Sequence, residues 1–264
     1  MEINCQNCNQ IVATNFCGYC GQKKYKRIDK QYIWDEIQYT TIHANKGLLY
    51  SLKNIIRNPG KTARKFVEGN RVNHYKPILL VFVLSGFSAF LSFKVIGIKE
   101  IMEKATAAQN VGSKFMDDYL VVMGSYYSFI MLLTVPFLAI FSKIAFRKWG
   151  HNYYEHVVMN AIGLSFYTST YIILFYPIIY SLKGNATLLL KFSQYSTIVI
   201  PFMMVWFYKG FYPEKSLKSI IVRVLLVVVF SIIVFLTLMI AIMIIYTIMI
   251  GPKEAMEYFS PKKL

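Results

Sequence analysis

Residues 220–250 form an apolar run in which Arg223 is the only charged side chain. A helix that is apolar on every side is stable only inside a large core or a membrane, and about 20 such residues are enough to cross a bilayer. The run therefore predicts a transmembrane helix. Its 31 residues would extend about 46 Å, which exceeds the bilayer core, so we expect strong tilt or a projecting end. A segment that re-enters the membrane is the alternative.

The composition agrees with membrane insertion, because 56% of the 264 residues are hydrophobic and 16% are charged. We expect no cleavable signal, since the first twenty residues contain cysteines and amides where an apolar stretch would be needed. The fold class we predict is an all-α polytopic membrane protein with about five transmembrane helices and a small N-terminal zinc ribbon. The other four predicted spans are residues 77–96, 119–141, 157–182 and 188–208.

Loop charges predict the orientation, because flanks rich in lysine and arginine stay in the cytoplasm. Residues 1–76 carry 13 basic and 5 acidic side chains, and the loops around Arg147 and Lys215 are also basic. The segment 97–118 balances its charges instead. We therefore expect a multi-pass membrane protein with its amino terminus in the cytoplasm and its carboxyl terminus outside. The net charge of +16 follows from this topology, and we do not expect nucleic acid as a partner.

All cysteines of the chain lie in its first twenty residues, as two Cys-x2-Cys pairs. In a reducing compartment, two such pairs predict four thiolate ligands of one zinc ion in place of disulfides. The short gap between the pairs suits a compact ribbon over residues 1–28, where Gly18 and Gly21 would permit a positive φ in the second turn. A redox-active pair or a knuckle without metal are the alternatives. The expected ligands are Cys5, Cys8, Cys17 and Cys20.

Residues 29–76 form a basic segment between the ribbon and the first span. Apolar residues recur at helical spacing over 48–56, and a second short helix is expected over 62–69. We expect both helices to lie in the headgroup region with their apolar faces toward lipid. One interpretation is that their cations bind anionic headgroups or a partner specifically. The other, which we favour, is that the cations only anchor and orient the protein at the membrane. The candidate binding residues are Arg57, Arg64, Lys65 and Arg71.

Six short segments carry a resemblance to a known family. They are residues 15–23, 46–49, 58–61, 66–72, 74–77 and 153–158. Together they resemble the bacterial membrane family called domain of unknown function 3667. The resemblance covers the ribbon, the juxtamembrane segment and the first three spans. It implies an inner-membrane protein with an N-terminal zinc ribbon, and it implies no activity, no further cofactor and no catalytic residue.

Few other residues suggest chemistry. Glu155 and His156 precede the third span and could bind a second metal or move a proton. Adjacent residues point away from each other on a helix, so we favour a structural role for both at an interfacial site. Asn160, Thr168 and Gln194 could meet in the bundle and line a passage, or could simply join helices. We expect no acid or base at depth, which argues against an ion-coupled carrier.

Two functions from different classes remain. We favour an accessory or regulatory protein whose cytoplasmic ribbon docks a protein partner, with the bundle (77–250) as its anchor. The alternative is a permease or lipid-handling protein with a pathway between the third and fourth spans. We expect no enzyme, because the sequence has no nucleophile–base pair, phosphate loop or metalloprotease motif. The last segment, 251–264, is expected to be a tail.

Overall fold

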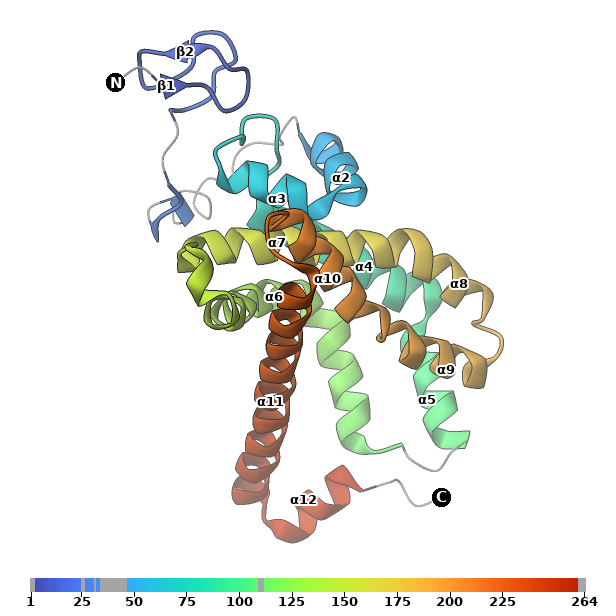
Figure 1. The fold of residues 1–264 in the computed structure, drawn as a ribbon. Helices are drawn as coiled ribbons and strands as arrows, with labels where there is room; N and C mark the ends of the chain where they lie inside the picture. Colours follow the sequence, from blue (N-terminus) through green and yellow to red (C-terminus); the bar gives the residue numbers. More distant parts are fainter. Residues whose placement is uncertain (1–2, 25–26, 31, 34–46, 109–111, 261–264) are drawn as a thin grey trace.

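The computed structural model describes residues 3–24, 27–30, 32–33, 47–108 and 112–260. In the ribbon, β1 (Ile3–Asn4) and β2 (Ile11–Val12) pair antiparallel. The described remainder is mainly helical (Figure 1). The α-helices are α2 (Leu48–Arg57), α3 (Pro59–Val67), α4 (Pro77–Phe90), α5 (Ile98–Ala108), α6 (Lys114–Ala145), α7 (Tyr153–Thr170), α8 (Tyr176–Ser181), α9 (Ala186–Ser196), α10 (Val199–Phe211), α11 (Leu217–Ile250) and α12 (Pro252–Phe259).

Five helical stretches in the described chain are long and apolar enough to cross a membrane, which confirms the predicted fold class. The first stretch has the predicted bounds, whereas the others start or end several residues away from them because polar residues at the ends of the helices continue the helical hydrogen bonding. The stretches are Pro77–Ile96, Lys114–Ala145, Tyr153–Ser181, Thr187–Phe211 and Leu217–Ile250.

Three of these stretches are irregular. The first ends in a π-helix, η2 (Leu91–Ile96), and the third contains another, η4 (Tyr171–Phe175). Pro177 follows η4 at the start of α8, where it removes a backbone donor and its ring displaces the carbonyl four residues earlier. In the fourth stretch, α9 and α10 are separated by a turn at residues 197–198.

The last span is one continuous helix, so the re-entrant alternative does not apply. α11 contains 34 residues, about 51 Å in length. Its buried residues, Ile220, Val224 and Val227, all lie in the first third, and Figure 1 shows the remainder running beyond the central helices to α12. The C-terminal tail contains α12, whose Tyr258 hydroxyl donates to Asp118 Oδ2 at the start of α6 (2.7 Å). The ribbon and α12 therefore lie at opposite ends of the molecule (Figure 1).

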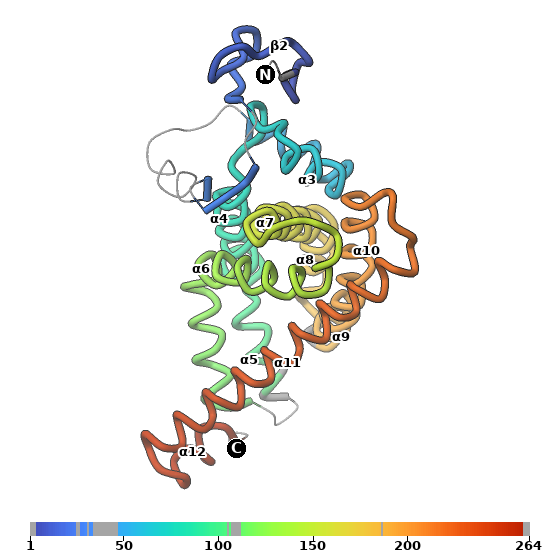
Figure 2. Tube along the Cα trace, turned by 60° about the vertical axis from the view of Figure 1, so that its left-hand side comes forward, coloured from blue at the N-terminus to red at the C-terminus, as the bar shows by residue number. Residues whose placement is uncertain are grey.

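The helix α7 lies at the centre of the packing, with α3 above it and α4 and α10 on either side (Figure 2). Its contact with α4 is the most extensive between any two described elements. Both helices carry buried serines there, Ser85 and Ser88 on α4 and Ser165 and Ser169 on α7. Small side chains let helices approach closely, which is the usual basis of helix packing in a membrane.

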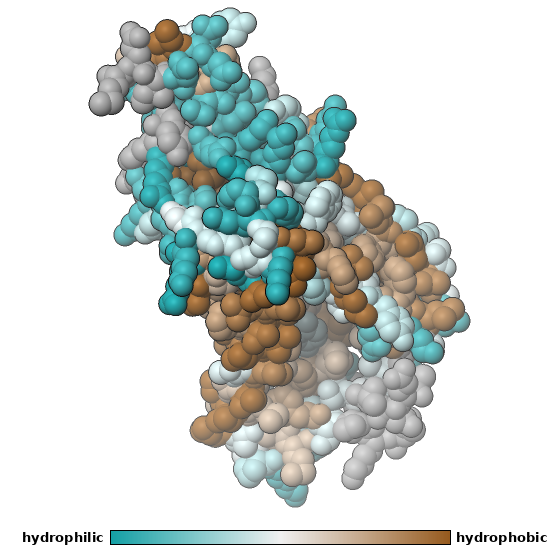
Figure 3. Space-filling view, in the orientation of Figure 1, coloured by the Kyte–Doolittle hydropathy of each residue, from teal (hydrophilic) through white to brown (hydrophobic). Residues whose placement is uncertain are grey.

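Loops that the charge pattern assigns to the same side lie together. Trp149 lies under the guanidinium of Arg223 (4.3 Å) and near the ammonium of Lys215 (5.5 Å), which joins the two basic loops. On the other side, α5 belongs to the segment 97–118 and packs against α9, which begins directly after the short loop around Lys183. Figure 3 shows hydrophilic residues over the ribbon and the helices beside it and hydrophobic residues over α11.

The expectation that the apolar face of α3 contacts lipid is wrong, because that face is covered by protein. Ala63 and Phe66 belong to the main core, and the helix packs on α7 and α10. A Cβ on Gly60 would lie 2.0 Å from the carbonyl oxygen of Phe207, and a Cβ on Gly210 would lie 3.2 Å from the Cα of Gly60. An amphipathic pattern predicts that one face is covered, but it does not distinguish lipid from protein.

Candidate metal centre and polar sites

The two cysteine pairs form two turns with the same hydrogen bonds. In the first turn, the Cys5 N–H donates to Gln10 O, and the Cys5 carbonyl accepts from the Asn9 N–H. In the second turn, the Cys17 N–H donates to Gln22 O, and the Cys17 carbonyl accepts from the Gly21 N–H. Asn9 (φ +61°) and Gly21 (φ +73°) both adopt the left-handed conformation directly after the second cysteine of their pair, which asparagine and glycine tolerate best. Of the two glycines singled out in the sequence, Gly21 has the positive φ and Gly18 does not.

The four sulfur atoms are arranged as a metal site. They lie within 4.8 Å of one another, and the Cys5–Cys20 and Cys8–Cys17 sulfur pairs are each 3.5 Å apart. In a tetrahedral site with Zn–S bonds of about 2.3 Å, the sulfurs would be about 3.8 Å apart. The donor set and its spacing therefore fit zinc.

The surroundings favour the thiolate form at two of the four cysteines, Cys17 and Cys20. A hydrogen bond from the Asn7 side chain lowers the pKa of Cys20 to about 6, and the backbone N–H groups of Cys20 and Tyr19 lower the pKa of Cys17. At Cys8, by contrast, a backbone hydrogen bond from Gln10 lowers the pKa, but burial and the other three cysteine side chains raise it to about 12. The hydrophobic cluster around the sulfurs is small, with Val12 as its only buried residue besides cysteine. Modules with so little apolar core commonly depend on a bound metal to fold.

Residues beside the cysteines attach the ribbon to the juxtamembrane segment. The Gln22 side chain is 5% exposed, and its Oε1 accepts hydrogen bonds from the backbone N–H groups of Arg71 (3.3 Å) and Val72 (3.2 Å). The Asn73 side chain donates to Asn7 Oδ1 (3.3 Å). Sequence reasoning missed Gln22 and Asn7, although the position of each beside a metal ligand was the available signal.

Glu155 has the structural role that we favoured. Its carboxylate accepts from Arg27 in a bidentate pair (2.8 and 3.0 Å). It also accepts from the backbone N–H of Asn152 (2.7 Å), while Asn152 Oδ1 accepts from the Glu155 N–H (2.9 Å). These reciprocal bonds form a capping box at the start of α7. Glu155 thus holds the chain that follows the ribbon against the third span.

His156 points in another direction, so the two residues do not form one site. The imidazole is fully buried, with Nδ1 2.9 Å from Ser142 Oγ. Its Nε2 has no hydrogen-bond partner among the described residues. The expectation of no buried acid or base in the bundle is therefore wrong, because the third stretch begins four residues earlier than predicted, at Tyr153, and includes the buried His156 three residues from that end.

The four basic candidates for lipid or partner binding do not gather into one site. Arg64 pairs with Glu214 (3.0 Å) in the loop between α10 and α11, and Arg71 donates to two carbonyl oxygens at the end of α3 (3.1 and 3.2 Å). Arg57 and Lys65 are exposed. Two of the four therefore have protein partners, and two remain available to headgroups.

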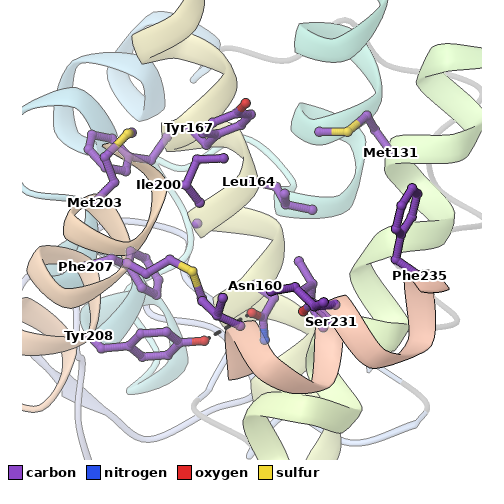
Figure 4. A pocket seen from close by; sticks show the side chains of 16 residues that line it. Met131, Asn160, Leu164, Tyr167, Ile200, Met203, Phe207, Tyr208, Ser231 and Phe235 are labelled. Carbon is purple, nitrogen blue, oxygen red and sulfur yellow. Dashed lines mark hydrogen bonds between the residues drawn. The ribbon is translucent and has the colours of Figure 1, made fainter. Parts of the chain in front are cut away.

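Of the three polar span residues, Asn160 lines a cavity of about 420 Å³ between α6, α7, α10 and α11 (Figure 4). Thr168 is buried elsewhere on α7, and Gln194 is exposed on α9. Neither lines this cavity. The structure thus does not bring the three together, but it does place a cavity between the third and fourth spans.

Comparison with known proteins agrees with the resemblance found in the sequence. Residues 45–89 match the family model described as a protein of unknown function (DUF3667). This region holds α2, α3 and most of α4, including Gly60 at the crossing with α10. No curated protein and no solved structure matches the chain.

Proposed function

We propose that the chain belongs to the DUF3667 family, whose model matches residues 45–89, and that it is an accessory membrane protein whose zinc-loaded ribbon docks a protein partner in the cytoplasm. The proposed role is binding and not catalysis. The membrane we propose is the bacterial inner membrane, with the ribbon inside.

The exposed surface of the ribbon is the observation that carries this proposal. Ile11 is 62% exposed, Phe16 is 56% exposed and Tyr19 is 80% exposed. Three large apolar side chains are many for a module of about 20 residues, and aromatic side chains are enriched where proteins bind one another. Because Asn7 and Gln22 bind the juxtamembrane segment, the ribbon would present these side chains in a fixed position.

The proposed role of the metal is structural. Four cysteine thiolates would complete the coordination of zinc and leave no open position for a substrate. Zinc would fold the two turns and so hold the residues between them, including Phe16 and Tyr19, in place. Loss of the metal should therefore abolish docking without preventing membrane insertion.

The proposed orientation is supported by charge and by packing. The basic loops lie together with the segment that follows the ribbon, through Arg27–Glu155 and Trp149–Arg223. Keeping this basic surface in the cytoplasm satisfies the positive-inside preference of all three regions at once.

Site-specific photocrosslinking in cells tests the docking proposal. A photoreactive residue at Tyr19 should capture one protein in about equal amount to the chain, and Cys17→Ser should abolish this capture. The matched control is a photoreactive residue at Leu49, which is 81% exposed on α2 and lies outside the ribbon. The proposal is wrong if position 19 captures only lipid, or if the same protein is captured equally from position 49.

A further inference from the structure

The cavity between the third and fourth spans has the size and position of a ligand site. Its volume of about 420 Å³ lies within the range of small-molecule sites, about 300–1,000 Å³. α7 and α10 form its inner wall, and α6 and α11 close its sides. It lies wholly within stretches that can cross a membrane.

The cavity can be reached from the lipid side. Ile232 and Phe235 of α11 line it, yet they are 52% and 59% exposed. The buried residues of α11 end at Val227, and the residues that follow it on this helix are half-buried or exposed. A molecule in the bilayer could therefore enter between α10 and the outer part of α11 without passing through the aqueous phase.

The lining selects an uncharged, mainly hydrocarbon molecule. No lysine, arginine, histidine, aspartate or glutamate is among the described residues that line the cavity. A charge placed there would have no counter-ion and would lose its hydration. Met131, Met203 and Met204 also line it, and methionine adapts its shape to a flexible chain. Anionic and zwitterionic headgroups therefore do not fit.

The polar groups of the lining offer hydrogen-bond acceptors. Both amide hydrogens of Asn160 are donated, to Ser142 Oγ and to the His156 carbonyl (each 2.7 Å). Because a carbonyl can only accept, these bonds also fix which way the amide faces. Asn160 Oδ1 receives a long bond of 3.3 Å from the Tyr208 hydroxyl (Figure 4). The Ser231 hydroxyl donates to Val227 O (2.8 Å), which leaves its oxygen as an acceptor.

We propose that this cavity binds one neutral lipid from the surrounding bilayer, a long-chain alcohol whose hydroxyl donates to Asn160 Oδ1 and whose chain lies along α10 and α11. Ser231 Oγ is the second acceptor, on the wall formed by α11. This inference does not depend on the role of the ribbon.

Photolabelling of the purified full-length protein in phosphatidylcholine nanodiscs tests the proposal. The probes are hexadecanol, its methyl ether and hexadecanoic acid, each with a diazirine at the same carbon. The alcohol should label peptides of α10 and α11 about three- to tenfold more than either other probe, since the ether lacks the donor and the acid carries a charge. Equal labelling by the three probes would overturn the proposal.

Variants that fill the cavity give the second test. Gly163 lines the cavity, and a Cβ there would meet the Phe207 ring at 3.6 Å, an ordinary contact, so that a larger side chain extends into the space. Gly163→Leu should reduce labelling by the alcohol about tenfold, while Gly184→Leu, at a site with open space, should not. Ser231→Leu fills the cavity from the outer wall and keeps the buried core intact, with Thr237→Leu on the same helix as control. Undiminished labelling of both filled variants would contradict the proposal.

Discussion

The side-chain oxygen of Gln22 lies 3.3 Å from the backbone nitrogen of Arg71 and accepts its hydrogen bond. Gln22 directly follows the second metal turn, because Gly21 separates it from Cys20. Arg71 in turn lies six residues before Pro77, where the first span begins. One buried side chain thus connects the conformation of the metal ribbon to the start of the membrane-spanning part.

Replacing Gln22 with alanine should release the ribbon from the juxtamembrane segment while the metal stays bound. The change removes two hydrogen bonds from the backbone N–H groups of Arg71 and Val72, each of which contributes about 0.5–1.5 kcal/mol. Hydrogen exchange of the two amides should become faster by about tenfold or more. Gln6→Ala is the control, since Gln6 is exposed in the first turn. Unchanged exchange in Gln22→Ala would show that the two parts are held by other contacts.

Gly60→Ala should destabilise the protein more than the same substitution at a glycine that has open space around it. The added Cβ would lie 2.0 Å from Phe207 O, so α3 must move away from α10, at a cost of about 1–3 kcal/mol or more. Thermal unfolding in detergent measures this against Gly184→Ala, where the Cβ meets no atom within 4 Å. Equal melting temperatures would mean that α3 is not packed on α10 in solution.

Patterns of spacing and hydropathy predicted much of this fold. The spacing of the cysteine pairs predicted that the four sulfurs gather, because contacts within so short a segment depend on local conformation. The first span was predicted with its observed bounds because an apolar helix must match the thickness of a bilayer.

Contacts between distant segments could not be predicted in the same way. The amphipathic pattern of α3 does not show that α10 covers its apolar face. A glycine after Asn58-Pro59 is as typical of the end of a helix as of a close contact between two helices, so the sequence did not reveal the role of Gly60. Asn160, Thr168 and Gln194 have similar polarity, yet Asn160 faces the cavity and Gln194 is exposed. The face that a helix buries depends on the neighbours that surround it, and only the folded chain supplies them.

Cysteine labelling should show an odd number of crossings. In a background where the four native cysteines are replaced, single cysteines at Thr106 and Ser260 should react with an impermeant thiol reagent in intact cells. Cysteines at Lys148 and Lys215 should not react, because the basic loops remain inside. Permeabilised cells provide the control, in which all four positions should react. Protection of Ser260 in intact cells would contradict the assignment of the continuous helix α11 to one crossing.

Stability should decrease in mild acid partly through His74. Burial, together with the charge of Lys65, lowers the pKa of His74 from 6.5 to about 4. Because the unfolded chain takes up this proton at higher pH, the stabilisation is complete above pH 6.5 and is lost as the pH falls toward 4. His74→Phe keeps an aromatic ring beside Tyr50 and Phe66 and should lose less stability between pH 7 and pH 4.5. Melting temperatures that fall equally with pH in the two proteins over this range would rule out His74 as the cause.

The metal content of the purified protein is the most direct test of the account. Elemental analysis should find one zinc ion per chain, bound through Cys5, Cys8, Cys17 and Cys20. Cys17→Ser should release the zinc and make the first thirty residues sensitive to protease, because the ribbon has too small a core to fold alone. A chain that contains no metal and yet keeps a protease-resistant ribbon would contradict it.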